Sequence, residues 1–405
     1  MNPSVTPESE RQPGCLPQWF IRGVFVPFAL TRLLLVLVAW SGFQLAPSPA
    51  KSGKWEVGDR GLIAPIEGGH FSRSHRFVDM WSRWDSEWYL SIAQHGYSFT
   101  PGRNSNIAFF PLYPCAVRAA HFFAPGQSDA RWLWSGIVLS NLSLLVGLTY
   151  LHRLIRLDHE EATAARAVLY LCLFPTTLFL SAFYSESLFL ALAVSAFYYG
   201  RQGRWIVAGS LAGLATLARP PGGLVAVALI FEYLAQKQFR WRELKADCLA
   251  LALSPLALFA HLAFLRWQFG DWFVLAHAEA VASWSRKFTL PWMTLGAFFQ
   301  HPHTGPNARD SYLDLLVTLI LLGLTTYSVF RLRRSYAIYA VITLLFLLSW
   351  GYLTSMPRFA VVIFPVMIAL ALFGRNVVFH RTYVFLSGSI ALGCMVAFSH
   401  WVWLG

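Results

Sequence analysis

Long apolar runs separated by short polar segments dominate the chain. A membrane-spanning helix needs roughly 20 apolar residues, and several of the runs reach about this length. The pattern predicts membrane helices near residues 20–43, 132–151, 164–183, 188–199, 248–267, 312–330, 336–350, 359–373 and 383–402. A shorter run at 205–217 is followed by Arg219-Pro220-Pro221-Gly222, which predicts a hairpin of two short helices. We therefore expect an all-α polytopic membrane protein, a single domain over residues 1–405 with about eleven transmembrane helices.

Two polar segments are too long to be simple connectors. The first covers residues 44–131 and opens with Pro47, Pro49 and Gly53. The second covers residues 270–310. Loops of this length inside a compact protein usually carry function, so we expect functional residues in the first loop.

Short basic clusters alternate with the apolar runs and predict the topology. Arg201, Arg240 and Arg333 belong to clusters that should face the cytoplasm together with the N-terminus. Lys54 and Arg286 should then face outside, as should both long loops. No small-residue cleavage site follows the polar leader, so we expect the first span to be retained.

The composition excludes an ordinary soluble domain. Of the 405 residues, 56% are hydrophobic and only 13% are charged, against about a quarter charged in a typical soluble protein. The net charge of +12 comes from the basic clusters between apolar runs, so we expect membrane lipid and no nucleic acid as a partner. The five cysteines are isolated and have no metal-type spacing.

An aromatic stripe in the first loop predicts a helix at the membrane interface. The apolar residues recur at steps of three and four, at Trp81, Trp84, Trp88 and Ile92. Because tryptophan favours headgroup depth, a helix over residues 81–96 should lie along the interface and end at Gly96. Asp85 and Glu87 would be held near that surface, either as solvated acids of an anchoring helix or as catalytic groups.

Short motifs occur in two separated blocks of the chain. The first block has RWD at 83–85, HGY at 95–97 and AFFP at 108–111. The later motifs are FP at 174–175, YSESLF at 184–189, LATLAR at 214–219, PRF at 357–359 and FP at 364–365. With these motifs the chain resembles the PIG-V family, GPI mannosyltransferase II, of the GT-C membrane glycosyltransferases. The chain departs from the family at Arg219-Pro220-Pro221-Gly222, where Arg-x-Asn-Gly is expected.

The resemblance implies a GT-C-type bundle and an inverting glycosyltransferase. The implied donor is a hexose, mannose above all, linked to polyprenyl or dolichyl phosphate. The implied acceptor is a hydroxyl of a glycan or glycolipid on the non-cytoplasmic face, and the acid of the first loop, Asp85, would be the base.

Asp85 has the chemistry that an inverting transfer needs. A general base near the acceptor hydroxyl must take its proton, and a carboxylate in a water-facing, apolar-rimmed position can do so. The alternative is an acid on a helix face that is only paired with Arg83.

Arg219 and Arg358 are candidates for binding the donor phosphate, because the planar guanidinium group suits phosphate oxygens. The predicted topology places both at outer helix ends, on the side of Asp85. Either arginine could instead extend to lipid headgroups. We also assign Arg83, Trp84, Glu87 and Glu186 to substrate binding.

Asp85 and Glu87, separated by Ser86, form an acidic pair that could hold Mg²⁺ or Mn²⁺, although the sequence does not require a cofactor. Glu186 could complete such a site, bind a sugar hydroxyl or cap the helix that follows it. Histidines 70, 95 and 121 are more typical of helix surfaces and loops than of ligands.

Two other classes of protein stay open at this point. A transporter or flippase for lipid-linked saccharides would carry ionisable residues near the bilayer midplane on broken helices, within paired repeats. The notable charges here gather at one face instead, which favours an enzyme. A non-catalytic subunit of a membrane complex is the third possibility.

Overall fold

The computed structural model describes residues 16–45, 75–124, 130–280, 287–300, 310–402 and 404. Within these ranges every regular element is a helix, as the apolar pattern predicts. The start of the first loop, Lys54, His70, Arg286 and part of the second loop lie outside the described residues.

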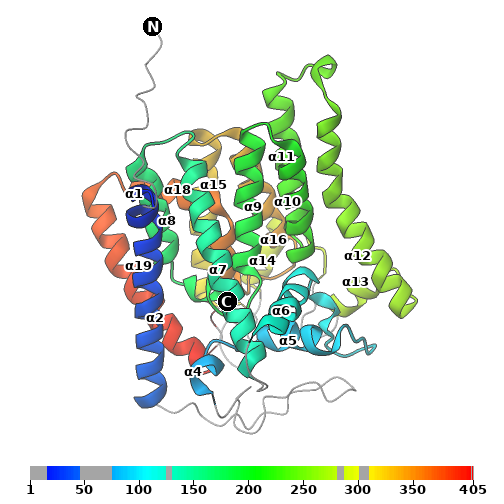
Figure 1. Ribbon diagram of the computed structural model, residues 1–405, viewed down its shortest axis with the longest axis vertical. Helices are drawn as coiled ribbons and strands as arrows, with labels where there is room; N and C mark the ends of the chain where they lie inside the picture. Colours follow the sequence, from blue (N-terminus) through cyan, green and yellow to red (C-terminus); the bar gives the residue numbers. More distant parts are fainter. Residues whose placement is uncertain are drawn as a thin grey trace.

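The N-terminal half consists of one long helix, a group of short helices and the first part of the bundle (Figure 1). In chain order these are α1 (Gln18–Phe20), η1 (Ile21–Phe25), α2 (Val26–Leu45), α4 (Arg76–Asp79), α5 (Ser86–His95), η2 (Asn106–Ala108), α6 (Leu112–Phe123), α7 (Ala130–Ile155), α8 (Glu161–Cys172), η3 (Thr177–Leu180), α9 (Glu186–Arg201), α10 (Trp205–Ala218) and α11 (Gly222–Gln236).

The C-terminal half adds helices around this bundle, and α19 returns beside α2 (Figure 1). Its elements are η4 (Trp241–Glu243), η5 (Ala246–Ala252), α12 (Leu253–Phe269), α13 (Val274–Glu279), α14 (Pro291–Phe298), α15 (Tyr312–Arg331), α16 (Arg334–Leu348), α17 (Met356–Phe359), η6 (Ala360–Val362), α18 (Phe364–Phe373) and α19 (Val377–Ser399).

Among the described residues, five helical stretches are long and apolar enough to cross a membrane. They are Gln18–Leu45, Ala130–Ile155, Ala246–Phe269, Tyr312–Arg331 and Val377–Ser399. Residues 356–362 and 364–373 form a sixth candidate, bent by 85° at the break, and α10, α11 and α16 are shorter apolar helices. The prediction of about eleven spanning helices is therefore not confirmed.

The predicted span at 164–183 is shorter than expected. Helix α8 has 12 residues and ends at Cys172. Pro175 follows, and a proline disfavours helical conformation in the residue before it. The chain continues through the short η3 and then enters α9. This produces a buried, irregular connection, residues 173–185, between two helices of the bundle.

Close approach of helix α7 fixes the position of this connection. A Cβ atom added to Gly136 of α7 would lie 2.2 Å from ring atoms of Phe183. Only glycine leaves room for the phenylalanine ring at that point, in the manner of small residues at membrane helix contacts. The connection is therefore packed tightly between α7 and the rest of the bundle.

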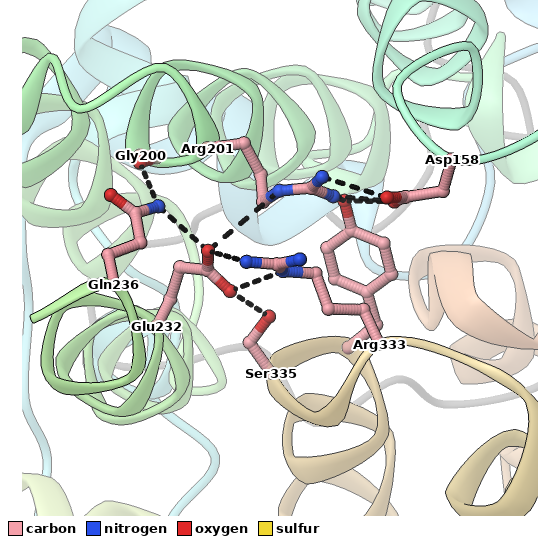
Figure 2. A network of polar contacts seen from close by, with 8 residues as sticks. Asp158, Gly200, Arg201, Glu232, Gln236, Arg333 and Ser335 are labelled. Atoms are coloured by element: carbon pink, nitrogen blue, oxygen red, sulfur yellow. Dashed lines mark hydrogen bonds and ion pairs between the residues drawn. The ribbon is translucent and has the colours of Figure 1, made fainter. Parts of the chain in front are cut away.

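A polar network joins helix ends at the end of the bundle that we predicted to be cytoplasmic (Figure 2). Glu232 of α11 accepts hydrogen bonds from Arg333 Nε and Nη2 at 2.8 and 2.7 Å and from Ser335 Oγ at 2.7 Å. Arg201 of α9 pairs with Asp158, in the turn between α7 and α8, at 2.5 Å. The network thus ties α9, α11 and α16 to the α7–α8 turn.

The predicted interfacial helix is shorter and more buried than its pattern indicated. Helix α5 begins at Ser86, because Trp84 has a left-handed backbone with φ of 54° that interrupts a helix. Trp81 precedes the helix and is buried with Tyr89 in the protein core. The predicted end is confirmed: Gly96 has φ of 83° and its N–H bonds the carbonyl of Ile92.

Candidate active site

The connection at residues 173–185 leads directly into Glu186, the first residue of α9. The Glu186 side chain is completely buried. Its Oε1 atom accepts from Arg219 Nη1 at 2.6 Å and from Arg358 Nε at 2.5 Å. A buried carboxylate is stable only when it is paired, and two guanidinium groups share this one.

Arg358 extends the cluster to the first loop. Its Nη1 atom donates to Oδ2 of Asp85, so one guanidinium group joins two carboxylates. We call Asp85, Glu186, Arg219 and Arg358 the charged centre. It contains two negative and two positive groups, and Asp85 is 25% exposed whereas Arg358 is 4% exposed. Asp85 is therefore the most accessible group of the centre.

Aromatic rings surround the two arginines. The guanidinium carbon of Arg358 lies 4.5 Å from the ring centre of Tyr184 and 5.3 Å from that of Phe179. The guanidinium carbon of Arg219 lies 5.6 Å from the ring centre of Phe359. Such contacts stabilise a cation away from water and restrict where its planar head can lie.

Two tyrosines hold the first loop against the irregular connection. The Tyr184 hydroxyl donates to the carbonyl of Arg83 at 2.9 Å and accepts from the N–H of Asp85 at 3.2 Å. The Tyr89 hydroxyl lies 2.7 Å from Ser185 Oγ. Burial raises the pKa of Tyr89 to about 12, so its hydroxyl stays neutral at physiological pH.

Arg83 lies beside the charged centre in the sequence but has another partner. Its guanidinium group is buried, pairs with Asp79 at 3.0 Å and donates from Nε to the carbonyl of Ser399 at 3.2 Å. It also lies 4.9 Å from the ring centre of Trp401. Arg83 thus joins the first loop to the end of α19, while the partner of Asp85 is Arg358.

The other two predicted binding residues flank Asp85. Trp84 packs edge-on against Trp401, with ring centres 5.9 Å apart. Glu87 is buried in the first turn of α5. The structure thus brings together Asp85, Glu186, Arg219 and Arg358, and the substrate-binding roles of Arg83, Trp84 and Glu87 stay predictions.

Arg32, in the middle of α2, was missed by the sequence analysis. It is buried and donates to the carbonyls of Cys172 at 2.9 Å and Thr177 at 3.2 Å. It also donates to Thr177 Oγ1 at 2.9 Å and to Ser181 Oγ at 3.0 Å. An arginine inside an apolar run is costly unless it has such partners, and this was the available signal.

The irregular connection also holds the segment that carries Arg358. Thr176 Oγ1 donates to the carbonyl of Pro357 at 2.6 Å. Arg32 therefore fixes the residues on either side of Thr176, and Thr176 fixes the residue before Arg358. Through these contacts α2 supports the charged centre indirectly, by way of the connection at residues 173–185.

The charged centre does not have the donor set of a divalent-cation site. Among the described residues, no group of three or more His, Cys, Asp or Glu side chains could hold a metal ion. Asp85 and Glu186 are each bound to a guanidinium group, whereas Mg²⁺ and Mn²⁺ prefer several unpaired oxygen ligands.

A known protein family matches the part of the chain that contains three of the four residues of the charged centre. Residues 71–269 match the model of the mannosyltransferase (PIG-V) family. The resemblance to the PIG-V family is confirmed. The PIG-V match includes Asp85, Glu186 and Arg219, whereas Arg358 lies beyond it.

Relatives named GPI alpha-1,6-mannosyltransferase 2 are similar to the same part of the chain. The mouse protein is 34% identical over 209 residues, which are 46% of this chain and 40% of the mouse protein. The human protein is 33% identical over 167 residues, which are 39% of this chain and 32% of the human protein. GPI mannosyltransferase 2 of Yarrowia lipolytica is 28% identical over 203 residues, or 50% of this chain and 52% of that protein. The chain thus spans about a third to a half of these relatives.

Among solved structures, the chain is similar to the oligosaccharyltransferase of Archaeoglobus fulgidus, with a TM-score of 0.42 and 14% identity. The match covers 91% of this chain and 52% of that protein. A TM-score below 0.5 does not establish a common fold, so the GT-C arrangement stays a prediction.

Proposed function

We propose that this protein is a membrane mannosyltransferase. It transfers the sugar of a polyprenyl- or dolichyl-phosphate-linked donor to a hydroxyl of a glycan or glycolipid, with inversion at the sugar carbon. One observation carries the proposal: Arg358 joins a fully buried carboxylate, Glu186, to an accessible carboxylate, Asp85. The similarity to mannosyltransferases of the PIG-V family supports the sugar and the reaction class.

In this mechanism Asp85 is the general base. The acceptor oxygen forms a bond to the sugar carbon as its proton passes to the Asp85 carboxylate. The bond from the same carbon to the phosphate oxygen breaks on the opposite face, and the lipid phosphate leaves with the electron pair. A carboxylate placed in this way contributes a factor of roughly 10²–10⁴ to the rate.

The two arginines stabilise the departing phosphate. The donor phosphate competes with Asp85 for Arg358, and this competition releases the Asp85 carboxylate to accept the proton. Glu186 holds both guanidinium groups when the phosphate is absent and keeps their planes in place. Preorganised cations of this kind act without reorganisation during the reaction.

The charged centre faces the non-cytoplasmic side in this proposal. It lies at the end of the bundle near α4, α5 and α6 (Figure 1), since Asp85 directly precedes α5 and Glu186 and Arg201 are at opposite ends of α9. Labelling of single cysteines with an impermeant reagent tests the orientation. Positions 54 and 240 should label from opposite sides, and labelling of both from the same side would mean that the predicted topology is wrong.

Purified protein incubated with polyprenyl-phosphate mannose, polyprenyl-phosphate glucose and a panel of glycolipid acceptors tests the reaction by mass spectrometry. We expect a mannose-bearing product with wild-type protein and none above background with Asp85→Asn. The alternative, a flippase for lipid-linked saccharides, predicts movement of the donor across sealed vesicles without a new glycosidic bond. That result in both proteins would reject the transferase.

A further inference from the structure

A groove on the outside of the bundle lies between α2, the end of α8 and α19. It has a volume of about 480 Å³ and is lined mainly by apolar side chains, among them Leu34, Leu35, Val384 and Leu392. Leu34 is 48% exposed and Phe385, on the rim, is 72% exposed. Since α2 and α19 are candidate membrane spans, the groove opens toward the hydrocarbon of the bilayer.

One end of the groove is cationic. Arg381 and His380, near the start of α19, line it there. Arg381 is exposed and has no acidic partner among the described residues. The His380 ring is held in place by a hydrogen bond of 2.9 Å between its Nδ1 and the Tyr170 hydroxyl. Arg375, just before α19, marks this as the basic end of the bundle, which we predicted to be cytoplasmic.

We propose that the groove binds an anionic phospholipid. The lipid phosphate lies against Arg381, and an acyl chain lies along the apolar wall between α2 and α19. The charge at one end and the apolar lining along the rest match the two parts of such a lipid. An acyl chain gains no hydrophobic free energy when it leaves the bilayer for the groove, because both surroundings are apolar. The affinity therefore depends on the headgroup charge and on how well the acyl chain packs in the groove.

The occupant is not the lipid-phosphate donor of the proposed reaction. Helix α19 continues from Arg381 to Ser399, whose carbonyl binds Arg83 beside the charged centre. At about 1.5 Å per residue, these two ends of the helix lie roughly 27 Å apart. A phosphate bound at Arg381 is therefore at the opposite end of the bundle from Arg358.

Two glycines of α19 provide a matched pair of variants. Gly388 lines the groove, and a Cβ atom added there would make an ordinary contact of 3.5 Å with Leu173 Cδ2. A leucine at this position should fold and fill the groove. A Cβ atom added to Gly393 would meet nothing within 4 Å. Gly393→Leu is thus a control on the same helix.

Native mass spectrometry of the purified full chain with added phosphatidylglycerol or phosphatidylcholine tests the proposal. Wild-type protein should retain one phosphatidylglycerol in preference to phosphatidylcholine, and Arg381→Gln should reduce that preference about fivefold. Gly388→Leu should weaken retention on the order of tenfold, whereas Gly393→Leu should match wild type.

Three results would overturn the proposal. They are equal retention of the two lipids by wild-type protein, unchanged retention in Gly388→Leu, and displacement of phosphatidylglycerol one for one by polyprenyl phosphate. Circular dichroism of each variant separates a filled groove from a misfolded chain. The test needs no enzymatic activity, so its outcome is independent of the proposed transferase.

Discussion

Asp85 and Arg358 stand 273 positions apart in the chain and form an ion pair in the fold. One residue comes from the first loop and the other from a four-residue helix, α17, near the C-terminal end of the bundle. In the proposed mechanism, this pair holds the Asp85 carboxylate in place before substrate arrives. It also makes the roles of the two residues separable by substitution.

Asp85→Asn should fold, insert and bind the lipid donor, because asparagine has a similar shape. It cannot accept a proton, so sugar transfer should fall at least about a hundredfold. Single-turnover transfer measured by mass spectrometry checks this. Glu87→Gln is the matched control and should have a smaller effect. Wild-type turnover in Asp85→Asn together with an inactive Glu87→Gln or Glu186→Gln would mean that the base is another residue.

Arg358→Ala and Arg219→Ala should each lower the rate on the order of 10²–10³-fold, because each removes a cation beside the developing phosphate charge. Arg358→Ala should be the more severe, since it frees both Asp85 and Glu186 from a shared partner. Kinetics with varied donor concentration measure both. If both variants behave like wild type, the arginines have only a structural or lipid-facing role.

Arg32→Met should lower kcat on the order of 10–100-fold and leave the KM for the donor nearly unchanged. The reason is that Arg32 positions the connection at 173–185, and small displacements of reacting groups are costly. Arg32→Lys should restore part of kcat because an ammonium group can still donate to carbonyls. Arg153→Met, at the other end of the bundle, is the control. A change in KM alone would contradict a positioning role.

Glu232→Gln should lower thermal stability in detergent without changing the chemistry of the charged centre. It leaves Arg333 without its buried anionic partner and takes a second carboxylate away from Arg201, which keeps Asp158, a loss of about 2–3 kcal/mol after allowance for the partial exposure of Arg333. Arg240→Gln, which breaks the exposed pair with Glu243, should change stability by less than about 1 kcal/mol. Equal melting temperatures in the two variants would show that the network does not hold the helices together.

The helical class and the common location of the charged residues could be predicted from the apolar runs and from the charges at their ends. The all-helical class follows from the apolar runs, and the expectation that Glu186 and Arg358 lie on the side of Asp85 agrees with the structure. Arg219 follows the short helix α10 and precedes Pro220, and Arg358 follows Pro357 in the short helix α17. The chain turns at both places, at the same end of the bundle.

Other features could not be predicted from the local pattern, and one of them depends on a contact between distant segments. The tryptophan spacing at 81–88 predicted a single helix, but the left-handed backbone of Trp84 interrupts it and α5 begins only at Ser86. The support that Arg32 gives to Thr177 joins residues 145 positions apart. The sequence also did not show which aspartate pairs with Arg83, because Asp79 and Asp85 are both only a few residues away.

The charged centre has a consequence for how the protein is made. Glu186 can pair with Arg219 as soon as α10 is in the membrane, but Arg358 follows Glu186 by 172 positions and Asp85 by 273. Until the ribosome has delivered α17, Asp85 therefore lacks its cation. Chains truncated at residue 350 should be degraded faster than full-length chains in a pulse-chase experiment, because their charged centre lacks Arg358 and leaves Asp85 without its cation. Synthesis of the last helices thus completes the charged centre, because it brings Arg358 to Asp85 and Glu186.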